Sequence, residues 1–320
     1  MLVLRFSATE HAQLWITFKA SLASLTQTSL NRAYKFISTE TEIAMKTKLS
    51  IFTGLMLSAL MLTPAHAGEN KCATGLTVKE GVLTIATGNP AYFPWVIDDA
   101  PESGQGFEAA VAYAVAEKMG YSKDKVEWVR ASFDQSIQPG PKDFDFNLQQ
   151  FSVTEDREKV VDFSESYFSS PMAVLIRKPT MEAGATATMD SLKTLKWGAA
   201  ASTTALGFIT DDIKPDSDPL LYDDVANVTE ALKAGQIDAG LFDLPTALFT
   251  SAVLLDDGVV LGQFPAEMAT NPDQFGLLMS NDNPIKPCVD EGVRRIKEDG
   301  TLLRIEAEWL QETTGVPLIK

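Results

Sequence analysis

The sequence predicts an α/β protein with two domains, because strand-like and helix-like stretches alternate along two successive parts of the chain. The chain has 320 residues. Each alternating run covers roughly 100 residues, a common size for one domain. The first run ends near Arg177, where the pattern starts again. Strands that alternate with helices favour mostly parallel sheets.

In the first run, residues 82–86 read as a buried strand, and "GNPAYFPW" at 88–95 reads as a loop because glycine and two prolines interrupt it. Apolar residues recur at every fourth position through 107–119, which predicts a helix. Two further strands are expected at 125–129 and 144–151.

The second run repeats this alternation. The expected elements are a helix at 189–195, a strand at 196–200, a helix opening at 202–209, a helix at 227–235, a strand at 236–242, and helices at 289–296 and 302–309. Asn227 or Thr229 is expected to cap the helix at 227–235, and Gly235 to end it.

Residues 45–67 have the three parts of a secretory signal peptide: a charged start, an apolar run over 49–62, and a small-residue cleavage site at 65–67. The apolar run is too short to cross a membrane. Residues 1–44 then read as an over-extended gene start before Met45, with a genuine N-terminal extension as the alternative. We therefore expect a soluble periplasmic protein, secreted through this signal peptide.

The charge of the exported part excludes nucleic acid and anionic membrane as partners. Residues 1–67 hold six of the 27 basic and three of the 43 acidic residues, which leaves residues 68–320 with a net charge of −19. Both histidines, His11 and His66, precede the expected cleavage point. A histidine triad, a histidine general base and a histidine metal site are therefore excluded, and no cofactor is expected.

Both cysteines, Cys72 and Cys288, lie in the exported part. In an exported protein an even pair is most simply a disulfide, with two unrelated thiols as the alternative. A bridge over so long a loop contributes about 4 to 5 kcal/mol in the chain-entropy model. The segment "AGENKC" lacks the apolar-x-small pattern that precedes the cysteine of lipid-anchored proteins, so no lipid anchor is expected.

Six segments occur in one order: "LTIATGNPAYFPW", "GQGFEAAVAYAVAEKMG", "FSVTEDREKVVDFSESYF", "STTA", "ALKAGQIDAGLFD" and "DQFGLLM". Together they resemble the periplasmic polar amino-acid-binding proteins of ABC importers (solute-binding protein family 3) over nearly all of residues 76–312. The resemblance implies the two-lobed type II periplasmic binding protein fold ("Venus flytrap"), with two hinge strands and a ligand between the lobes. Lobe 1 is then expected at 70–168 plus 275–320, and lobe 2 at 172–271.

Arg157 is the first candidate binding residue. The segment "SVTEDR" matches the family's Thr-x-Thr-x-x-Arg motif, with Ser152 in place of the usual first threonine. The resemblance makes Arg157 the clamp for the carboxylate of an amino acid, and a guanidinium binds a carboxylate in a bidentate manner. The alternative is a surface ion pair with Glu155 or Glu158.

Further residues complete the expected head-group site. The resemblance assigns Thr203 and Thr204, at a helix start, to the same carboxylate. The alternative is helix capping alone, by Ser202 or Thr203. The resemblance also assigns Asp243, at a strand end, to the ammonium of the ligand. The alternative for Asp243 is a cap of the following helix.

Aromatic residues are expected around the ligand side chain. The resemblance places Tyr92, Trp95 and Phe133 where family members stack aromatic rings on the ligand. The alternative for each is core packing, which we favour for Trp95.

Two positions depart from the family pattern. Asn89 falls where cation-binding members often carry Asp, which argues against Lys, Arg or His as the ligand. Gln149 and Gln150 replace a small Ser-Gly pair, and Gln150 is expected to narrow the site or to reach the ligand. The ligand's identity is therefore open, and the candidates include opines and γ-glutamyl compounds.

The resemblance implies a binding protein rather than an enzyme. It would bind a polar or zwitterionic amino acid, or a derivative with an α-amino-acid head group, and deliver it as a monomer to the membrane permease subunits of an ABC transporter. One alternative is a ligand sensor that docks to a receptor. Another is an enzyme that resembles cyclohexadienyl dehydratases, for which Glu108 and Glu155 are the nearby carboxylates, although neither shows a partner that shifts its pKa.

Overall fold

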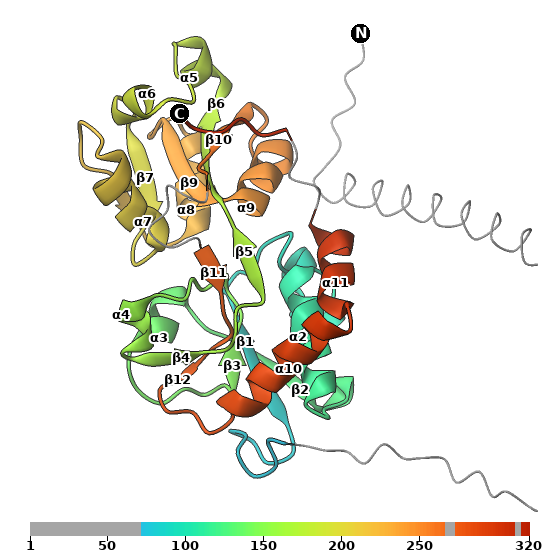
Figure 1. Ribbon diagram of the computed structural model, residues 1–320. Helices are drawn as coiled ribbons and strands as arrows, with labels where there is room; N and C mark the ends of the chain where they lie inside the picture. Colours follow the sequence, from blue (N-terminus) through green and yellow to red (C-terminus); the bar gives the residue numbers. More distant parts are fainter. Residues whose placement is uncertain (1–71, 266–272, 311–314) are drawn as a thin grey trace, which may run out of the picture. The chain divides into compact units, whose positions relative to one another are not determined.

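A computed structural model describes residues 72–265, 273–310 and 315–320 of the chain (Figure 1). All of these lie in one compact unit, His66–Lys320. The expected signal peptide at 45–67 and the segment before it lie outside the described residues. In the described ranges, no helix has the length and apolar character that a membrane crossing needs.

The first sheet has the strand order β2-β1-β3-β12-β4. Its strands are β1 (Leu83–Thr87), β2 (Val126–Arg130), β3 (Phe146–Asn147), β4 (Val161–Phe163) and β12 (Leu278–Ser280). Strand β1 is parallel to β2 and β3, whereas β12 is antiparallel to β3 and β4. Figure 1 shows helices α2 (Phe107–Lys118), α10 (Lys286–Glu298) and α11 (Thr301–Trp309) on one side, and α3 (Phe133–Ile137) and α4 (Glu155–Glu158) on the other.

The second sheet has the order β10-β6-β9-β7-β8. Its strands are β6 (Met172–Arg177), β7 (Trp197–Ala200), β8 (Leu220–Tyr222), β9 (Ala239–Asp243) and β10 (Gly258–Gln263). Alternate side chains of β6 enter two cores: one includes α6 (Met189–Lys193) and α7 (Thr204–Phe208), the other α8 (Val225–Lys233) and α9 (Leu244–Phe249). Helix α5 (Lys178–Glu182) follows β6 directly.

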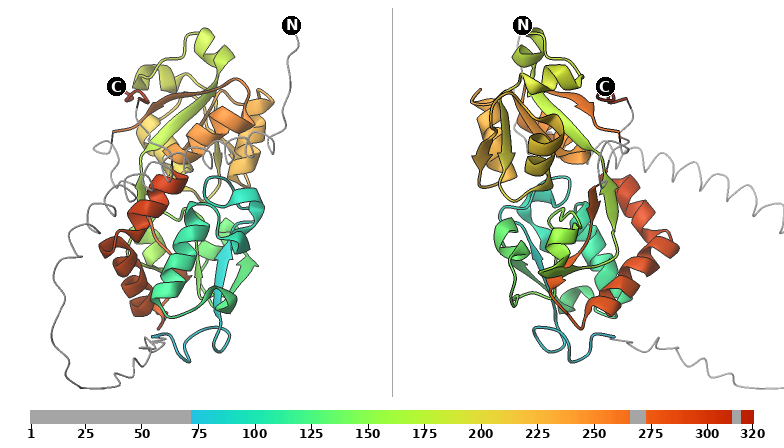
Figure 2. Two further views of the ribbon diagram at one scale, coloured as in Figure 1. Left: turned by 90° about the vertical axis from the view of Figure 1, so that its right-hand side faces the viewer. Right: turned by 60° about the vertical axis from the view of Figure 1, so that its left-hand side comes forward.

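The two sheets form two lobes, and a pair of short antiparallel strands lies between them (Figure 2). These are β5 (Phe168–Ser170), which leads into β6, and β11 (Asp273–Phe275), which leads into β12. The chain therefore passes between the lobes through these two strands, in agreement with the two hinge strands that the resemblance implies.

Three expectations about the elements were wrong. The sheets are mixed rather than mostly parallel, because β6 and β12 are antiparallel to both of their neighbours. The strand expected at 144–151 covers only Phe146–Asn147, because the chain bends at residues 143–145 and 149 and Gln150 has a left-handed φ of 51°. The cap of α8 is Asp224, whose carboxylate accepts from the Asn227 N–H, and not Asn227 or Thr229.

The end of the chain lies against the second sheet, although the expected first lobe ran to residue 320. Leu318 forms a parallel bridge with Gln263 at the end of β10, and Ile319 is buried in the core beside α6. The Ile319 N–H donates to the Gln263 carbonyl and the Gln263 N–H donates to the Pro317 carbonyl, and these two backbone hydrogen bonds hold the segment in place. The remaining lobe limits stay a prediction.

Cys72 and Cys288 form a disulfide, as predicted, with 5.8 Å between their Cα atoms. Cys288 lies on α10 and is buried in the core of the first lobe. The bridge therefore fixes the segment before β1 to the C-terminal helices.

Candidate ligand-binding site

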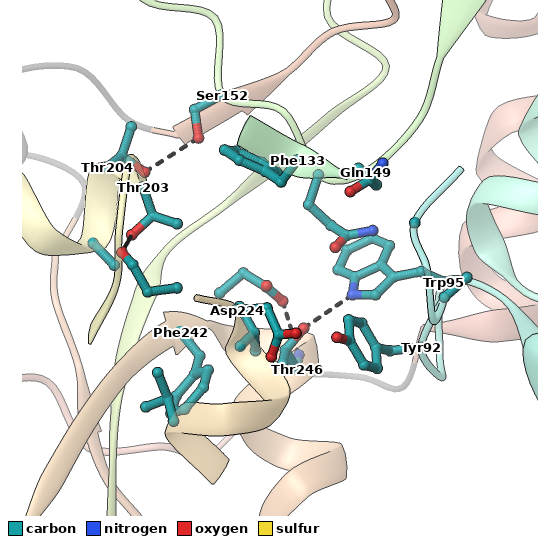
Figure 3. Close-up of a pocket in the computed structure, with 18 of the residues that line it drawn as sticks. Tyr92, Trp95, Phe133, Gln149, Ser152, Thr203, Thr204, Asp224, Phe242 and Thr246 are labelled. Atoms are coloured by element: carbon teal, nitrogen blue, oxygen red, sulfur yellow. Dashed lines mark hydrogen bonds between the residues drawn. The ribbon is translucent and has the colours of Figure 1, made fainter. Parts of the chain in front are cut away.

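One cavity of about 380 Å³ is lined by residues from both lobes (Figure 3). Its size suits a small organic ligand. The lining contains all nine predicted binding residues, namely Asn89, Tyr92, Phe133, Gln150, Ser152, Arg157, Thr203, Thr204 and Asp243. Strands β1, β7 and β9 reach it at their carboxyl ends, through Thr87, Ala200 and Asp243. This is the edge at which α/β proteins bind ligands.

Arg157 is buried at the cavity and is not a surface ion-pair residue. Its Nη1 donates to the Ser152 carbonyl at 2.8 Å, and its Nη2 donates to the Ser202 carbonyl of the other lobe at 2.9 Å. Its guanidinium also lies 5.2 Å from the centre of the Phe133 ring. In the described residues it forms no ion pair with Glu155 or Glu158. A guanidinium has five N–H groups, so three remain for a ligand.

Ser152, Thr204 and Asp273 form a polar group beside Arg157. The Ser152 and Thr204 hydroxyl oxygens are 3.3 Å apart across the two lobes, and the Thr204 hydroxyl donates to Asp273 at 3.4 Å. Burial raises the pKa of Asp273, while hydrogen bonds and the Arg157 charge oppose this. The guanidinium therefore has one carboxylate of the protein close by.

Asp243 both caps a helix and lines the cavity. Its Oδ1 accepts from the Thr246 N–H at 2.8 Å, which makes it the N-cap of α9. Burial raises the pKa of Asp243 to about 6, and the neighbouring Asp273 carboxylate adds to the increase. Asp243 therefore caps the following helix, as the alternative held, and its carboxylate still lines the cavity.

Thr203 likewise has the capping role that was left open. Its hydroxyl accepts from the Leu206 N–H at 3.4 Å at the start of α7, and it donates to the Ala200 carbonyl at 2.7 Å. Thr203 and Thr204 both line the cavity, where Figure 3 shows them near Ser152. A ligand at this end meets hydroxyl groups from both lobes.

The aromatic residues divide between wall and core. Tyr92 is half-buried in the wall, and burial together with the Asp224 carboxylate raises its pKa to about 12. Phe133 stacks on Phe151 with the ring centres 4.7 Å apart. Trp95 is 1 % exposed and belongs to the first core, as favoured, but its indole N–H also donates to the Thr246 hydroxyl of the other lobe at 2.9 Å (Figure 3).

The two carboxylates considered for an enzyme lie in different places. Glu155 is exposed and is not part of the cavity lining. Glu108 lines the cavity, and burial raises its pKa to about 7, although hydrogen bonds from Tyr167 and Gln150 lower it. The partners of Glu108, Gln150 and Tyr167, lie in distant segments of the chain, so no local pattern in the sequence reveals them.

Sequence reasoning missed several polar groups of the lining, among them Gln149 as an oriented amide, Asp224, Thr246 and Asp273. Asp224 carries a recognisable signal, since an Asp directly before a helix is a common cap. Asp273 opens the segment "DQFGLLM", but its place near Arg157 depends on contacts between distant segments, namely the Ser152–Phe275 bridge and the hydrogen bond from the Val153 N–H to the Gln274 carbonyl.

Three comparisons place the chain among known proteins. The model of the bacterial extracellular solute-binding proteins, family 3, matches residues 83–312. The L-cystine-binding protein TcyJ of Escherichia coli is 27% identical over 208 residues, which are 64% of this chain and 73% of that protein. An arginine-binding periplasmic protein of Mannheimia haemolytica is 26% identical over 242 residues, which are 74% of this chain and 94% of that protein.

Solved structures show the same fold. An ancestral arginine-binding protein bound to arginine superposes with a TM-score of 0.59 and 24% identity, over 72% of this chain and 99% of that one. A substrate-binding protein of an amino acid ABC transporter from Streptococcus pneumoniae, bound to L-arginine, gives a TM-score of 0.58 and 24% identity, over 71% of this chain and 93% of that one. With this fold and a family model that matches residues 83–312, the chain belongs to the bacterial extracellular solute-binding proteins of family 3.

Proposed function

We propose that the protein is the substrate-binding component of an ABC importer and binds the zwitterionic head group of an amino acid in the cavity between its lobes. The observation that carries this proposal is the placement of one buried guanidinium, Arg157, and two partly buried carboxylates, Asp243 and Asp273, in a single cavity. A zwitterion offers its carboxylate to the guanidinium and its ammonium to the two carboxylates, which would share it.

The ligand carboxylate would bind the free N–H groups of Arg157, near the Ser152 and Thr204 hydroxyls. The ligand ammonium would lie beside Asp243, with Asp273 close enough to affect the same charge. Both ends of the zwitterion are then paired and hydrogen-bonded, which a buried charge requires. Tyr92 and Phe133 would contact the ligand side chain.

The charge of the lining bears on the ligand side chain. In the described residues it contains six carboxylates, Glu108, Asp134, Asp223, Asp224, Asp243 and Asp273, and one guanidinium. This balance favours neutral or cationic side chains over acidic ones. The expectation from Asn89, which disfavours cationic ligands, stays a prediction that the same screen tests.

We further propose that the protein acts in the periplasm as a monomer and hands its ligand to separate permease subunits. Support comes from the family description as extracellular solute-binding proteins and from the relatives named as binding proteins. The contact between the Ser152 and Thr204 hydroxyls joins the two lobes directly. Closure of the lobes on a ligand would present both to the permease together.

A thermal-shift screen tests the proposal. The purified protein is heated with each of the twenty amino acids, with opines and with γ-glutamyl compounds. A ligand at about a hundred times its Kd stabilises the folded state by about 2.7 kcal/mol, which raises the Tm by several degrees. We expect such a shift with at least one compound that has an α-amino-acid head group. A screen in which none of these compounds raises the Tm would overturn the proposal.

A further inference from the structure

Glu108 is a buried carboxylate of the cavity that the head-group assignment does not use. It lies in the first turn of α2 and is 1 % exposed. Within the described part of the chain it has no Lys or Arg partner. It accepts three hydrogen bonds instead: from the Gln150 backbone N–H at 2.8 Å, from Gln150 Nε2 at 2.5 Å, and from the Tyr167 hydroxyl.

This arrangement fixes the amide of Gln150. An ionised carboxylate only accepts hydrogen bonds, so it holds the NH2 group of the amide and repels the carbonyl oxygen. The Oε1 of Gln150 is therefore turned away from Glu108. Among the described residues nothing donates to this oxygen, and Gln150 lines the cavity.

Gln149 shows the same arrangement with different partners. Its Nε2 donates to the Ala131 carbonyl at 2.9 Å and to Asn147 Oδ1 at 3.4 Å. Its Oε1 also has no donor in the described residues. Figure 3 shows Gln149 near Phe133, on the same side as Trp95 and Tyr92 and away from the Ser152–Thr204 contact. The first lobe thus offers two oriented amide oxygens to the cavity.

We propose that Gln150 is a specificity-determining residue whose Oε1 accepts a hydrogen bond from the ligand side chain, and that Glu108 is the positioning residue that sets this orientation. The site then selects a side chain that ends in an N–H group over a side chain of the same shape that ends in a carboxylate. This inference rests on the proposed function, because it takes an amino acid as the ligand.

Two physical effects enforce this selection. A carboxylate beside the Gln150 Oε1 would meet an acceptor where it needs a donor, and both groups would be buried without a hydrogen bond. Sites that hydrogen-bond one polar group reject an analogue without it strongly. The carboxylates Asp134 and Asp224 of the lining repel a second negative charge as well. We expect glutamine to bind at least about tenfold more tightly than glutamate.

The test uses titration calorimetry of the full-length protein at pH 8 with two matched pairs, glutamine with glutamate and asparagine with aspartate. The wild type should favour the amide member of the pair that binds more tightly. Gln150→Met removes the acceptor at similar volume. The Kd of the acid member divided by the Kd of the amide member should therefore fall at least about fivefold. An unchanged ratio in Gln150→Met overturns the inference.

Glu108→Gln separates positioning from a structural role. Its side-chain oxygen still accepts from the Gln150 backbone and from Tyr167, but its NH2 group allows the Gln150 amide to turn. The ratio should fall in Glu108→Gln, and it should not fall further when Glu108→Gln is added to Gln150→Met. A change in the Kd ratio when Glu108→Gln is added to Gln150→Met would contradict positioning through Gln150. If Glu108→Gln fails to fold, Gln150→Met alone decides.

Matched controls come from exposed positions outside the cavity. Glu117→Gln lies on the same helix, α2, and Gln236→Met makes the same exchange as Gln150→Met. Both should keep the wild-type ratio. Binding of other amino acids with neither pair detectable overturns the inference and leaves the proposed function intact. Binding of no amino acid at all overturns both.

Discussion

Arg157 joins the two sides of the cavity through two backbone carbonyls, Ser152 O from one lobe and Ser202 O from the other. We predict that Arg157→Ala lowers amino-acid affinity by about a hundredfold or more, because the ligand carboxylate loses its buried partner. Titration calorimetry with the best ligand of the screen measures this effect.

The control for this variant is Arg304→Ala, since Arg304 is exposed on α11 and lies outside the cavity lining. It should bind like the wild type. The circular dichroism spectrum of Arg157→Ala should stay native, because the side chain bonds to loop carbonyls and not to the sheet ladders. A native Arg157→Ala with wild-type affinity would show that the ligand carboxylate binds elsewhere.

At the scale of elements, the disulfide connects helix α10 with the segment before β1, across 216 residues of sequence. We predict that replacing both Cys72 and Cys288 by Ser lowers the free energy of unfolding by about 4 to 5 kcal/mol, because the unfolded chain gains the freedom of an open loop. Urea unfolding of the ligand-free protein measures this difference.

Ligand affinity is the matched readout for this variant. Neither cysteine lines the cavity, so a folded double variant should keep its affinity within about twofold. A loss of less than about 1 kcal/mol in the free energy of unfolding would contradict the proposed loop constraint.

The sequence predicted the elements whose pattern is local. Helix α2 follows its four-residue apolar repeat, and β1, β7 and β9 are continuous buried runs. Strands such as β12 and β11 have only three residues, and their pairing with distant antiparallel neighbours defines them. No period within the strand reveals such an element, and the residues of β6 do not reveal that it pairs antiparallel with β9 and β10, so the mixed sheets were missed.

The site shows the same division. The motif around Ser152 and Arg157 could be recognised, because its residues are neighbours in the sequence. The network of Glu108, Gln150 and Tyr167 could not, since its members are 42 and 59 positions apart. The raised pKa of Glu108 follows from burial, which only the packing of α2 determines.

At the scale of the whole molecule, folding and binding should respond to pH in opposite directions. Burial raises the pKa of Asp243 to about 6 and that of Glu108 to about 7. Below these values the folded protein holds protons that the unfolded chain has released. We predict that the free energy of unfolding of the ligand-free wild type, relative to Asp243→Asn, falls as the pH rises from 5 to 7.

Ligand affinity should change the other way, because an ammonium group binds the ionised form of Asp243. The Asp273 charge adds to the raised pKa of Asp243, and the Asp243 charge in turn raises the pKa of Glu108. Below pH 6 the affinity should fall about tenfold for each pH unit. Calorimetry at pH 5, 6, 7 and 8 measures this slope. An affinity that stays constant down to pH 5 would contradict a role for ionised Asp243 in binding.

The central claim is that the cavity clamps both ends of an amino-acid head group. Titration calorimetry with the best ligand, its decarboxylated analogue and its deaminated analogue tests this most directly. We predict that each analogue binds at least about a hundredfold more weakly than the amino acid, since each leaves a buried charge of the protein unpaired. In the Asp243→Asn variant, the deaminated analogue should lose less affinity relative to the amino acid than it loses in the wild type. An analogue that binds as tightly as the amino acid would contradict the claim.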